Sequence, residues 1–219
     1  MFNTLLQAFP TPKFLDIPFA GLSISDSAVR CIQFVRKGGR LYVEKYTEKV
    51  LAPGIINSGE VINKEELVTI LQSLKKELNL NYVKVSLPEE KAYLFSAKIP
   101  IVKDDEIKSA IESKIEENVP VPPGELIFDY KIIPNQVTDH LNVVVSTFQI
   151  SIVDTYIEIA ETAGLSLLSM EIESQAITRS LLPEGKEGTH LIVHFGAEKV
   201  GLCVAHNSIV HFTSTIPTT

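Results

Sequence analysis

Few residues in this sequence stand at spacings that support catalysis or metal binding. The two cysteines, Cys31 and Cys203, each lie in an apolar run typical of a buried strand, so we expect two reduced core thiols. No Cys-x-x-Cys, Gly-x-Ser-x-Gly or phosphate-loop Gly-x-x-x-x-Gly-Lys motif occurs. The adjacent acids Glu89-Glu90 and Glu116-Glu117 are expected on the solvated surface. The sequence therefore predicts no structural zinc site, no catalytic residue and no conventional hydrolase chemistry.

Composition and charge indicate a folded chain with ample core material. The sequence has 219 residues, is 45% hydrophobic and carries a net charge of −7. This composition excludes a disordered chain and argues against sequence-independent nucleic-acid binding. No run reaches the roughly 20 apolar residues of a membrane span. The N-terminus also lacks the basic start and cleavage site of a signal peptide, so we expect a cytoplasmic protein.

Residues 1–17 are expected to form a tail with a short apolar stripe. The stripe either packs on protein or touches a membrane, and ten residues make too short a helix to be stable alone. It comprises Phe2, Leu5, Leu6 and Phe9.

The N-terminal part of the sequence predicts a β-β-β-α-β unit. Apolar runs at Phe19–Ser23, Ala28–Val35 and Leu41–Val50 indicate three consecutive antiparallel strands. The helix begins near Asn63, which stands three residues before Glu66 as in a capping box. Its apolar residues recur at the helical period, and a short apolar strand over 83–87 follows.

The middle part predicts a compact β-α-β-β-α-β module over residues 91–172. Its first helix ends before the proline-rich segment 119–123, since proline disfavours helix at the residue before it. Its second helix is closed by Gly164. The expected elements are, in order, Tyr93–Ile99, a helix from Asp104, Ile127–Ile133, Leu141–Gln149, Ser151–Ala163 and Leu165–Glu171.

The C-terminal part repeats the pattern of the N-terminus. A short helix over Ser174–Leu182 and a polar linker lead to strand-like runs at Leu191–Phe195, Val200–Ala205 and Ile209–Ser214. The order is again strand, short polar turn, strand, hairpin and strand, roughly 170 residues after the first copy. This internal echo predicts one hairpin module at each end of the chain.

Four segments, taken in order, resemble a known family. They are AGLSISDSAVRCIQFVRKGGRLYVEKY (20–46), EIKSAIESKIEENVPVPPGELIFDY (106–130), VVVSTFQISIVDTYIEIAETAGLSLLSMEIESQAITRSL (143–181) and HLIVHFGAEKVGLCVAHNSIVHFTSTIP (190–217). Together they resemble the type IV pilus assembly protein PilM family, which is related to the cell-division protein FtsA. The resemblance covers nearly the whole chain. It implies a mixed α/β and α+β architecture, namely an incomplete actin-like (ribonuclease H-like) fold with an inserted β-α-β-β-α-β subdomain.

The resemblance divides the chain into four parts. A first actin-like subdomain spans 1–90, the inserted subdomain spans 91–172, and a returning helix with its linker spans 173–188. Residues 189–219 then begin a second actin-like domain. Family members continue beyond this point with the adenine-contacting part, so the second domain is expected to be truncated or reduced. An open sheet of this size must lean on the first unit, pair with a neighbour or remain partly mobile.

In the actin-like fold, each half contributes a hairpin loop that binds nucleotide phosphates. Such loops use small residues, free backbone N–H groups and a nearby carboxylate that organises the metal. ATP with Mg²⁺ is therefore the implied cofactor. The implied phosphate-contacting residues are Ser23, Ser25, Asp26, Ser27, Gly196, Ala197 and Glu198.

The phosphate motifs depart from the family pattern. Ser23 stands where the family has its first Asp, Ser25 where it has Gly, and His194 where it has its second Asp. Losing the acids removes expected partners of Mg²⁺, which prefers carboxylate oxygens. Losing the glycine restricts how closely backbone can approach a phosphate. The sequence therefore predicts a degenerate nucleotide site.

The resemblance also implies a partner, the N-terminal tail of a PilN-like inner-membrane protein, bound in a groove beside the inserted subdomain. The expected contacts are in the apolar loop formed by Val119, Val121, Pro122 and Pro123. Alternatively, these residues only cover the core of that subdomain. A scaffold of this kind lies at the inner face of the membrane and is attached through its partner.

Two other functions remain open at this point. One is an ATP-binding actin-like protein with nucleotide between residues 21–27 and 194–199. The other is an FtsA-like division protein that anchors a filament to the membrane.

Overall fold

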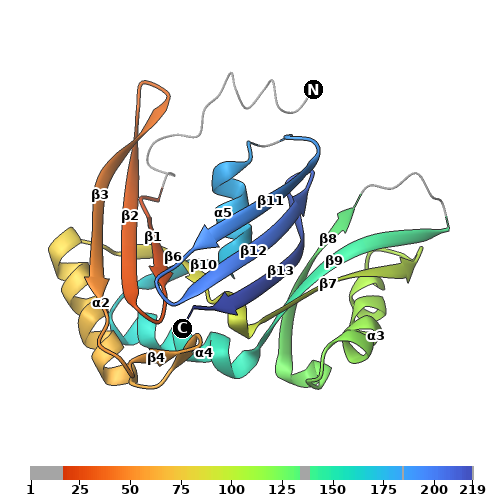
Figure 1. The fold of residues 1–219 in the computed structure, drawn as a ribbon, viewed down its shortest axis with the longest axis horizontal. Helices are drawn as coiled ribbons and strands as arrows, with labels where there is room; N and C mark the ends of the chain where they lie inside the picture. Colours follow the sequence, from red (N-terminus) through yellow and green to blue (C-terminus); the bar gives the residue numbers. More distant parts are fainter. Residues whose placement is uncertain (1–16, 134–138, 184, 219) are drawn as a thin grey trace.

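The computed structural model describes residues 17–133, 139–183 and 185–218. The structure contains a five-stranded sheet, a three-stranded sheet formed within residues 92–149, and a three-stranded C-terminal sheet (Figure 1). The N-terminal stripe of Phe2, Leu5, Leu6 and Phe9 lies outside the described residues. Within those ranges, no helix combines the length and the apolar character that crossing a bilayer requires.

The first sheet has the strand order β10-β6-β1-β2-β3. β1 (Ala20–Ile24), β2 (Ala28–Lys37) and β3 (Arg40–Val50) form an antiparallel meander, which confirms the predicted three-strand opening. β6 (Tyr82–Leu87) is parallel to β1, and β10 (Ser166–Ile172) is parallel to β6. Parallel strands require long connections, and here the connection from β6 to β10 contains the inserted sheet.

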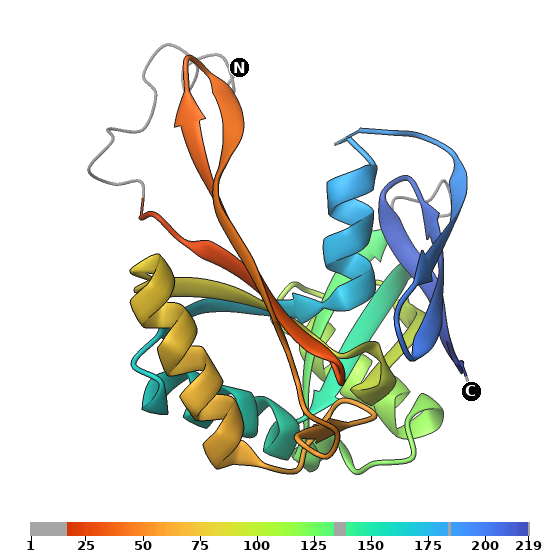
Figure 2. The same ribbon diagram turned by 60° about the vertical axis from the view of Figure 1, so that its left-hand side comes forward.

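Two helices, α2 (Lys64–Leu78) and α4 (Ile150–Thr162), form a layer below the first sheet (Figure 2). The predicted helical stripe of α2 is confirmed, because Leu67, Leu71 and Leu74 are at most 1% exposed and belong to the core under the sheet. The expected start of α2 is also confirmed. Asn63 is its N-cap, and the side-chain Oδ1 accepts a hydrogen bond from the Glu66 backbone N–H at 3.1 Å.

The inserted unit is smaller than predicted. The prediction assigned α4 and β10 to this unit, over 91–172, and that assignment is wrong. β10 pairs with β6, and α4 buries Val153, Tyr156 and Ile159 in the same core as α2. The one-sided apolar pattern correctly predicts the helix α4, but such a pattern does not identify the sheet that a helix covers.

The inserted unit therefore consists of β7 (Ala92–Pro100), α3 (Ile107–Asn118), β8 (Leu126–Ile133) and β9 (His140–Gln149). Its three strands are antiparallel in the order β7-β9-β8. α3 packs on the sheet through an apolar stripe, and this second core is separate from the first. The stripe is Ile107, Ile111 and Ile115.

The C-terminal part forms its own sheet, as the internal echo predicted. β11 (Thr189–Phe195), β12 (Lys199–His206) and β13 (Ile209–Pro217) are antiparallel and share no strand with the first sheet. This sheet leans on α5 (Glu173–Leu181), β7 and the 3-10 helix Glu89–Lys91. α5 thus lies between the first sheet and the C-terminal sheet (Figure 2).

The cap of α2 provides a test of the first core. We expect Asn63→Ala to lower the free energy of unfolding by about 1 kcal/mol, because the Glu66 N–H loses its acceptor at the helix start. Asn63→Asp keeps an acceptor oxygen at this position and serves as the matched control. Urea unfolding followed by circular dichroism measures both variants. Equal losses in the two variants would contradict a capping role.

Candidate functional site: a cleft between two hairpin turns

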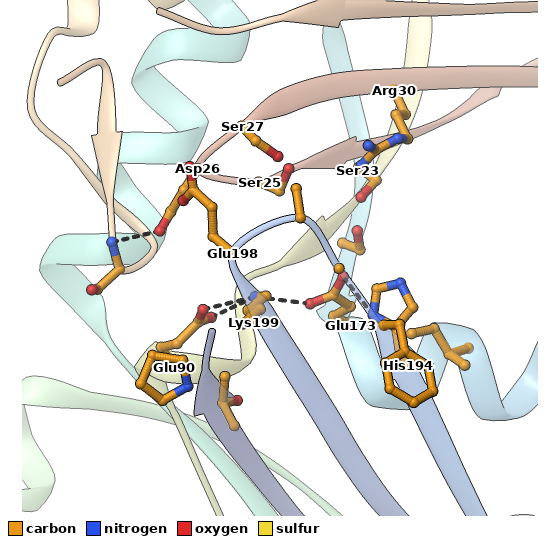
Figure 3. Close-up of a pocket in the computed structure, with 18 of the residues that line it drawn as sticks. Ser23, Ser25, Asp26, Ser27, Arg30, Glu90, Glu173, His194, Glu198 and Lys199 are labelled. Atoms are coloured by element: carbon orange, nitrogen blue, oxygen red, sulfur yellow. Dashed lines mark hydrogen bonds and ion pairs between the residues drawn. The ribbon is translucent and has the colours of Figure 1, made fainter. Parts of the chain in front are cut away.

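The turn after β1 and the turn after β11 face one another across an open cleft of about 800 Å³ (Figure 3). The structure brings all of the predicted phosphate-contacting residues into the lining of this cleft. From the first sheet these are Ser23, Ser25, Asp26 and Ser27, and from the C-terminal sheet Gly196, Ala197 and Glu198.

The two turns have the same backbone hydrogen bond. The Ser25 N–H donates to the Ala28 carbonyl at 3.0 Å, and the Gly196 N–H donates to the Lys199 carbonyl at 2.8 Å. The structural equivalence of Ser25 and Gly196 agrees with the duplication predicted from the sequence. In the first turn, however, the Ser25 Oγ also accepts the Ala28 N–H at 3.2 Å. A backbone donor that a phosphate loop would leave free is therefore already used.

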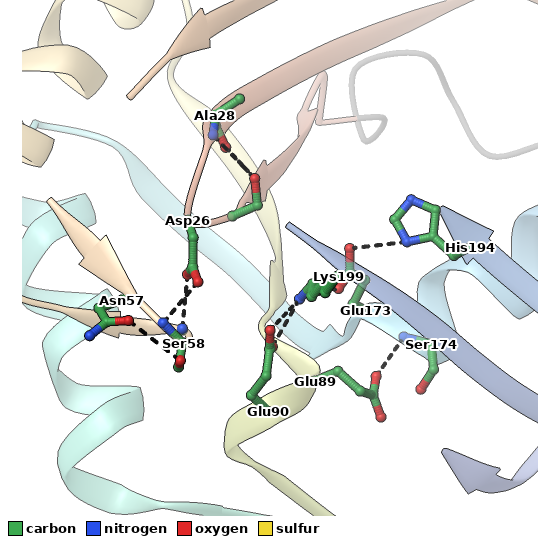
Figure 4. Close-up of polar contacts among 12 residues, drawn as sticks. Asp26, Ala28, Asn57, Ser58, Glu89, Glu90, Glu173, Ser174, His194 and Lys199 are labelled. Atoms are coloured by element: carbon green, nitrogen blue, oxygen red, sulfur yellow. Dashed lines mark hydrogen bonds and ion pairs between the residues drawn. The ribbon is translucent and has the colours of Figure 1, made fainter. Parts of the chain in front are cut away.

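Asp26 is engaged in holding a neighbouring turn. Its two carboxylate oxygens accept the backbone N–H groups of Ser58 at 2.8 Å and Gly59 at 2.9 Å (Figure 4). These residues join β4 (Ile56–Asn57) to β5 (Glu60–Val61), and the two strands form a short antiparallel hairpin. Gly59 has a φ of +74°, and a Cβ atom there would lie 2.6 Å from the Pro88 Cβ.

A buried ion cluster closes the floor of the cleft. The Lys199 Nζ lies 2.7 Å from Glu90 Oε1 and 3.2 Å from Glu173 Oε2, and all three side chains are less than one-fifth exposed (Figure 3). The His194 Nδ1 lies 4.0 Å from Glu173 Oε1. Burial by itself lowers the pKa of Lys199, but the contacts with Glu90 and Glu173 outweigh it and the pKa is raised overall. Lys199 therefore stays charged at neutral pH.

The prediction that Glu89 and Glu90 lie on the solvated surface is wrong. Both lie in the 3-10 helix Glu89–Lys91, which the C-terminal sheet covers. Glu90 pairs with Lys199, and Glu89 Oε2 accepts the Ser174 N–H at the start of α5 at 3.0 Å (Figure 4). Burial raises the pKa of Glu89 above its ordinary value.

Sequence reasoning missed this cluster because its members come from distant segments. In the sequence, Glu90 comes just before the inserted unit and Glu173 comes after it. Lys199 follows a further 26 residues along the chain, in β12. The position of Lys199 at the end of the second predicted turn was the sequence feature that could have indicated a cation at the cleft.

The donor set of the cleft does not suit a Mg²⁺–ATP complex. Three of its carboxylates already have partners, namely Asp26, Glu90 and Glu173. The remaining lining carboxylate is Glu198, and the fixed cations of the lining are Arg30 and Lys199. Four carboxylates against two cations repel a polyanionic nucleotide. Within the described residues, no group of three or more His, Cys, Asp or Glu side chains could hold a metal ion.

The proline-rich loop predicted to bind a partner is largely part of the inserted core. Val119 is 6% exposed and Val121 is half-buried against the same core, so the contact prediction is wrong for Val119. The alternative interpretation, that these residues cover the core, holds for both valines. Pro122 is exposed and Pro123 is half-buried, and their role in binding stays a prediction.

Two solved structures resemble this chain over most of its length. The PilM–PilN type IV pilus biogenesis complex superposes with a TM-score of 0.78 at 20% identity, over 91% of this chain and 61% of that chain. The cytoplasmic domain of EpsL, an inner-membrane component of the type II secretion system of Vibrio cholerae, superposes with a TM-score of 0.63 at 8% identity. This second match covers 92% of this chain and 71% of the EpsL chain.

A cleft between two equivalent hairpin modules, together with these likenesses, defines a protein of the actin-like fold. Residues 21–215 match the family described as type IV pilus assembly protein PilM, and the chain belongs to this family. It spans 61% of the length of the chain that it resembles in the PilM–PilN complex.

The buried Glu89 predicts a pH dependence of stability. Because its folded-state pKa is raised, the folded protein binds a proton more tightly than the unfolded chain does. Stability should therefore fall as the pH rises from the unfolded value of about 4.5 through the raised folded value. We expect Glu89→Gln to raise the Tm by about 2–4 °C at pH 7, and to raise it less as the pH approaches 4.5.

Thermal unfolding of both proteins across this pH range measures the effect. Glu158→Gln is the matched control, since Glu158 is an exposed acid whose partner is Lys64. A Tm difference for Glu89→Gln that stays constant with pH would contradict the raised pKa.

Proposed function

We propose that this protein is a cytoplasmic scaffold of type IV pilus assembly that binds the N-terminal tail of a PilN-like inner-membrane protein. Membership of the PilM family and the likeness to a PilM–PilN complex support the proposal. The scaffold stays at the inner face of the membrane through this partner.

The observation that carries the proposal is a groove between two sheet edges. Among the described residues, β8 is one of the two edge strands of the inserted sheet, and β10 is one of the two edge strands of the first sheet. Residues of both strands line one cavity of about 240 Å³. An extended peptide between such edges gains backbone hydrogen bonds as an added strand, and pockets along the groove select its side chains.

The lining of the groove defines the chemistry of the tail. Its walls are mainly apolar, and its acids are Asp129 and Glu171. Glu171 is neutralised by a bidentate pair with Arg179, which leaves Asp129 as the available negative charge. Tails of membrane proteins on the cytoplasmic side are rich in Lys and Arg. The groove therefore suits an extended apolar peptide with a basic residue. The apolar lining includes Ile127, Phe128, Phe148, Met170 and Ile172.

Calorimetric titration tests this function with a synthetic peptide that carries the N-terminal tail sequence of the PilN-like protein of the same organism. We expect the protein to bind the peptide, and Ile127→Asp to weaken binding by tenfold or more, because a charge then faces the apolar peptide. Ile127 is 52% exposed, so its replacement does not disturb a core.

Ile132→Asp is the matched control on the same strand. Ile132 is 41% exposed and lies outside the groove lining, so this variant should bind the peptide like the original protein. Absence of heat at millimolar peptide would refute the proposed function. Equal binding by the two variants would refute the groove as its site.

A further inference from the structure

The cleft between the turns after β1 and β11 brings several negatively charged side chains together. Four carboxylates line it, and the C-terminal sheet is anchored to the rest of the protein along the same cleft. Carboxylates brought together across a joint repel one another unless a cation lies between them. Such a group of acids is accommodated by the positive charge of a bound metal or a basic side chain, or by uptake of a proton.

Lys199 supplies that charge from within the chain. It belongs to β12 of the C-terminal sheet, whereas Glu90 follows β6 of the first sheet and Glu173 begins α5. The ammonium group thus joins three elements within 3.2 Å, in a place where its side chain is 17% exposed. An ion pair buried to this degree is weakly screened by salt and strongly destabilising to break on one side.

Other cations of the cleft do not substitute for Lys199. Arg30 is directed to Glu48 at 3.1 Å, and both of these side chains are half exposed. His194 lies 4.0 Å from Glu173 and is 44% exposed. The joint therefore depends on one ammonium group.

We propose that Lys199 is a built-in cation that joins the C-terminal sheet to the segments following β6 and β10 of the first sheet, so that holding the two sides of the open cleft together requires no nucleotide and no metal. The proposal goes beyond the scaffold function, because it concerns the cleft between the turns after β1 and β11. The proposed partner site is elsewhere, in the groove between β8 and β10. The nucleotide site of the fold has, in this chain, become a structural joint. A scaffold with such a joint keeps its shape whatever the cellular nucleotide level is.

Thermal unfolding with defined additives tests the joint. The original protein should keep the same Tm in buffer, in MgCl₂, in ATP with EDTA and in ATP with MgCl₂. Lys199→Met should lower the Tm by about 5 °C or more, because two buried carboxylates then lose their cation. MgCl₂ alone should recover part of this loss, since Glu90 and Glu173 both remain close to the vacated position.

The triple variant Lys199→Met/Glu90→Gln/Glu173→Gln separates charge from packing. It should regain most of the Tm lost by Lys199→Met and should not respond to MgCl₂. This variant also keeps the test decisive if Lys199→Met alone fails to fold. Lys64→Met is the matched control, because Lys64 pairs with Glu158 at 2.6 Å on the exposed surface and its loss should leave the Tm nearly unchanged.

Hydrogen exchange reports where the joint opens. In Lys199→Met, exchange should rise in β12 and β13 and at the two turns, and should stay unchanged in α3 of the inserted unit. A rise in the Tm of the original protein with ATP, with or without Mg²⁺, would overturn the proposal. Equal Tm values for Lys199→Met and Lys64→Met would overturn it as well.

Discussion

The parallel register of β1, β6 and β10 is the constraint on which the rest of this structure depends. Ser23 of β1 lies opposite Ser86 of β6, and Leu87 of β6 lies opposite Ile172 of β10. The three strands therefore end at one edge of the sheet, and the residues that follow them meet there. Binding sites of open α/β sheets commonly lie beyond the carboxyl ends of parallel strands. The acids at the cleft come together for this reason, although the sequence separates them widely.

This register explains which features could be predicted from the sequence. The strands of both hairpin modules and the cap at Asn63 follow from local periodicity and turn chemistry, so they were predicted closely. The assignment of α4 and β10 to a sheet depends on a pairing across the whole inserted unit, which no local pattern records. The burial of Glu89 and Glu90 also depends on a sheet that begins about 100 residues later. A pair of adjacent acids after a proline has the composition of a surface turn, and only the tertiary structure shows otherwise.

The two hairpin turns have the same backbone hydrogen bond, but their side chains make different contacts. Both keep the same N–H to carbonyl hydrogen bond, so the duplicated turn is preserved. Their side chains have diverged. In the first turn, the side chains of Ser25 and Asp26 accept hydrogen bonds from nearby backbone N–H groups. At the end of the second turn, Lys199 forms ion pairs with Glu90 and Glu173. Family membership therefore defines the architecture of this cleft, while its chemistry must be derived from the side chains that line it.

The inserted unit is connected to the rest of the protein by two stretches of chain that lie side by side in space. Its first residue, Ala92, lies opposite Phe148 near the end of β9, and the chain crosses to α4 directly afterwards. Chain ends that lie side by side allow a segment to be replaced without moving the structure around it. Changes on the α3 side of this unit can therefore leave the pairing of β6 with β10 intact, whereas β7 and Phe148 are tied to the C-terminal sheet and to the first core.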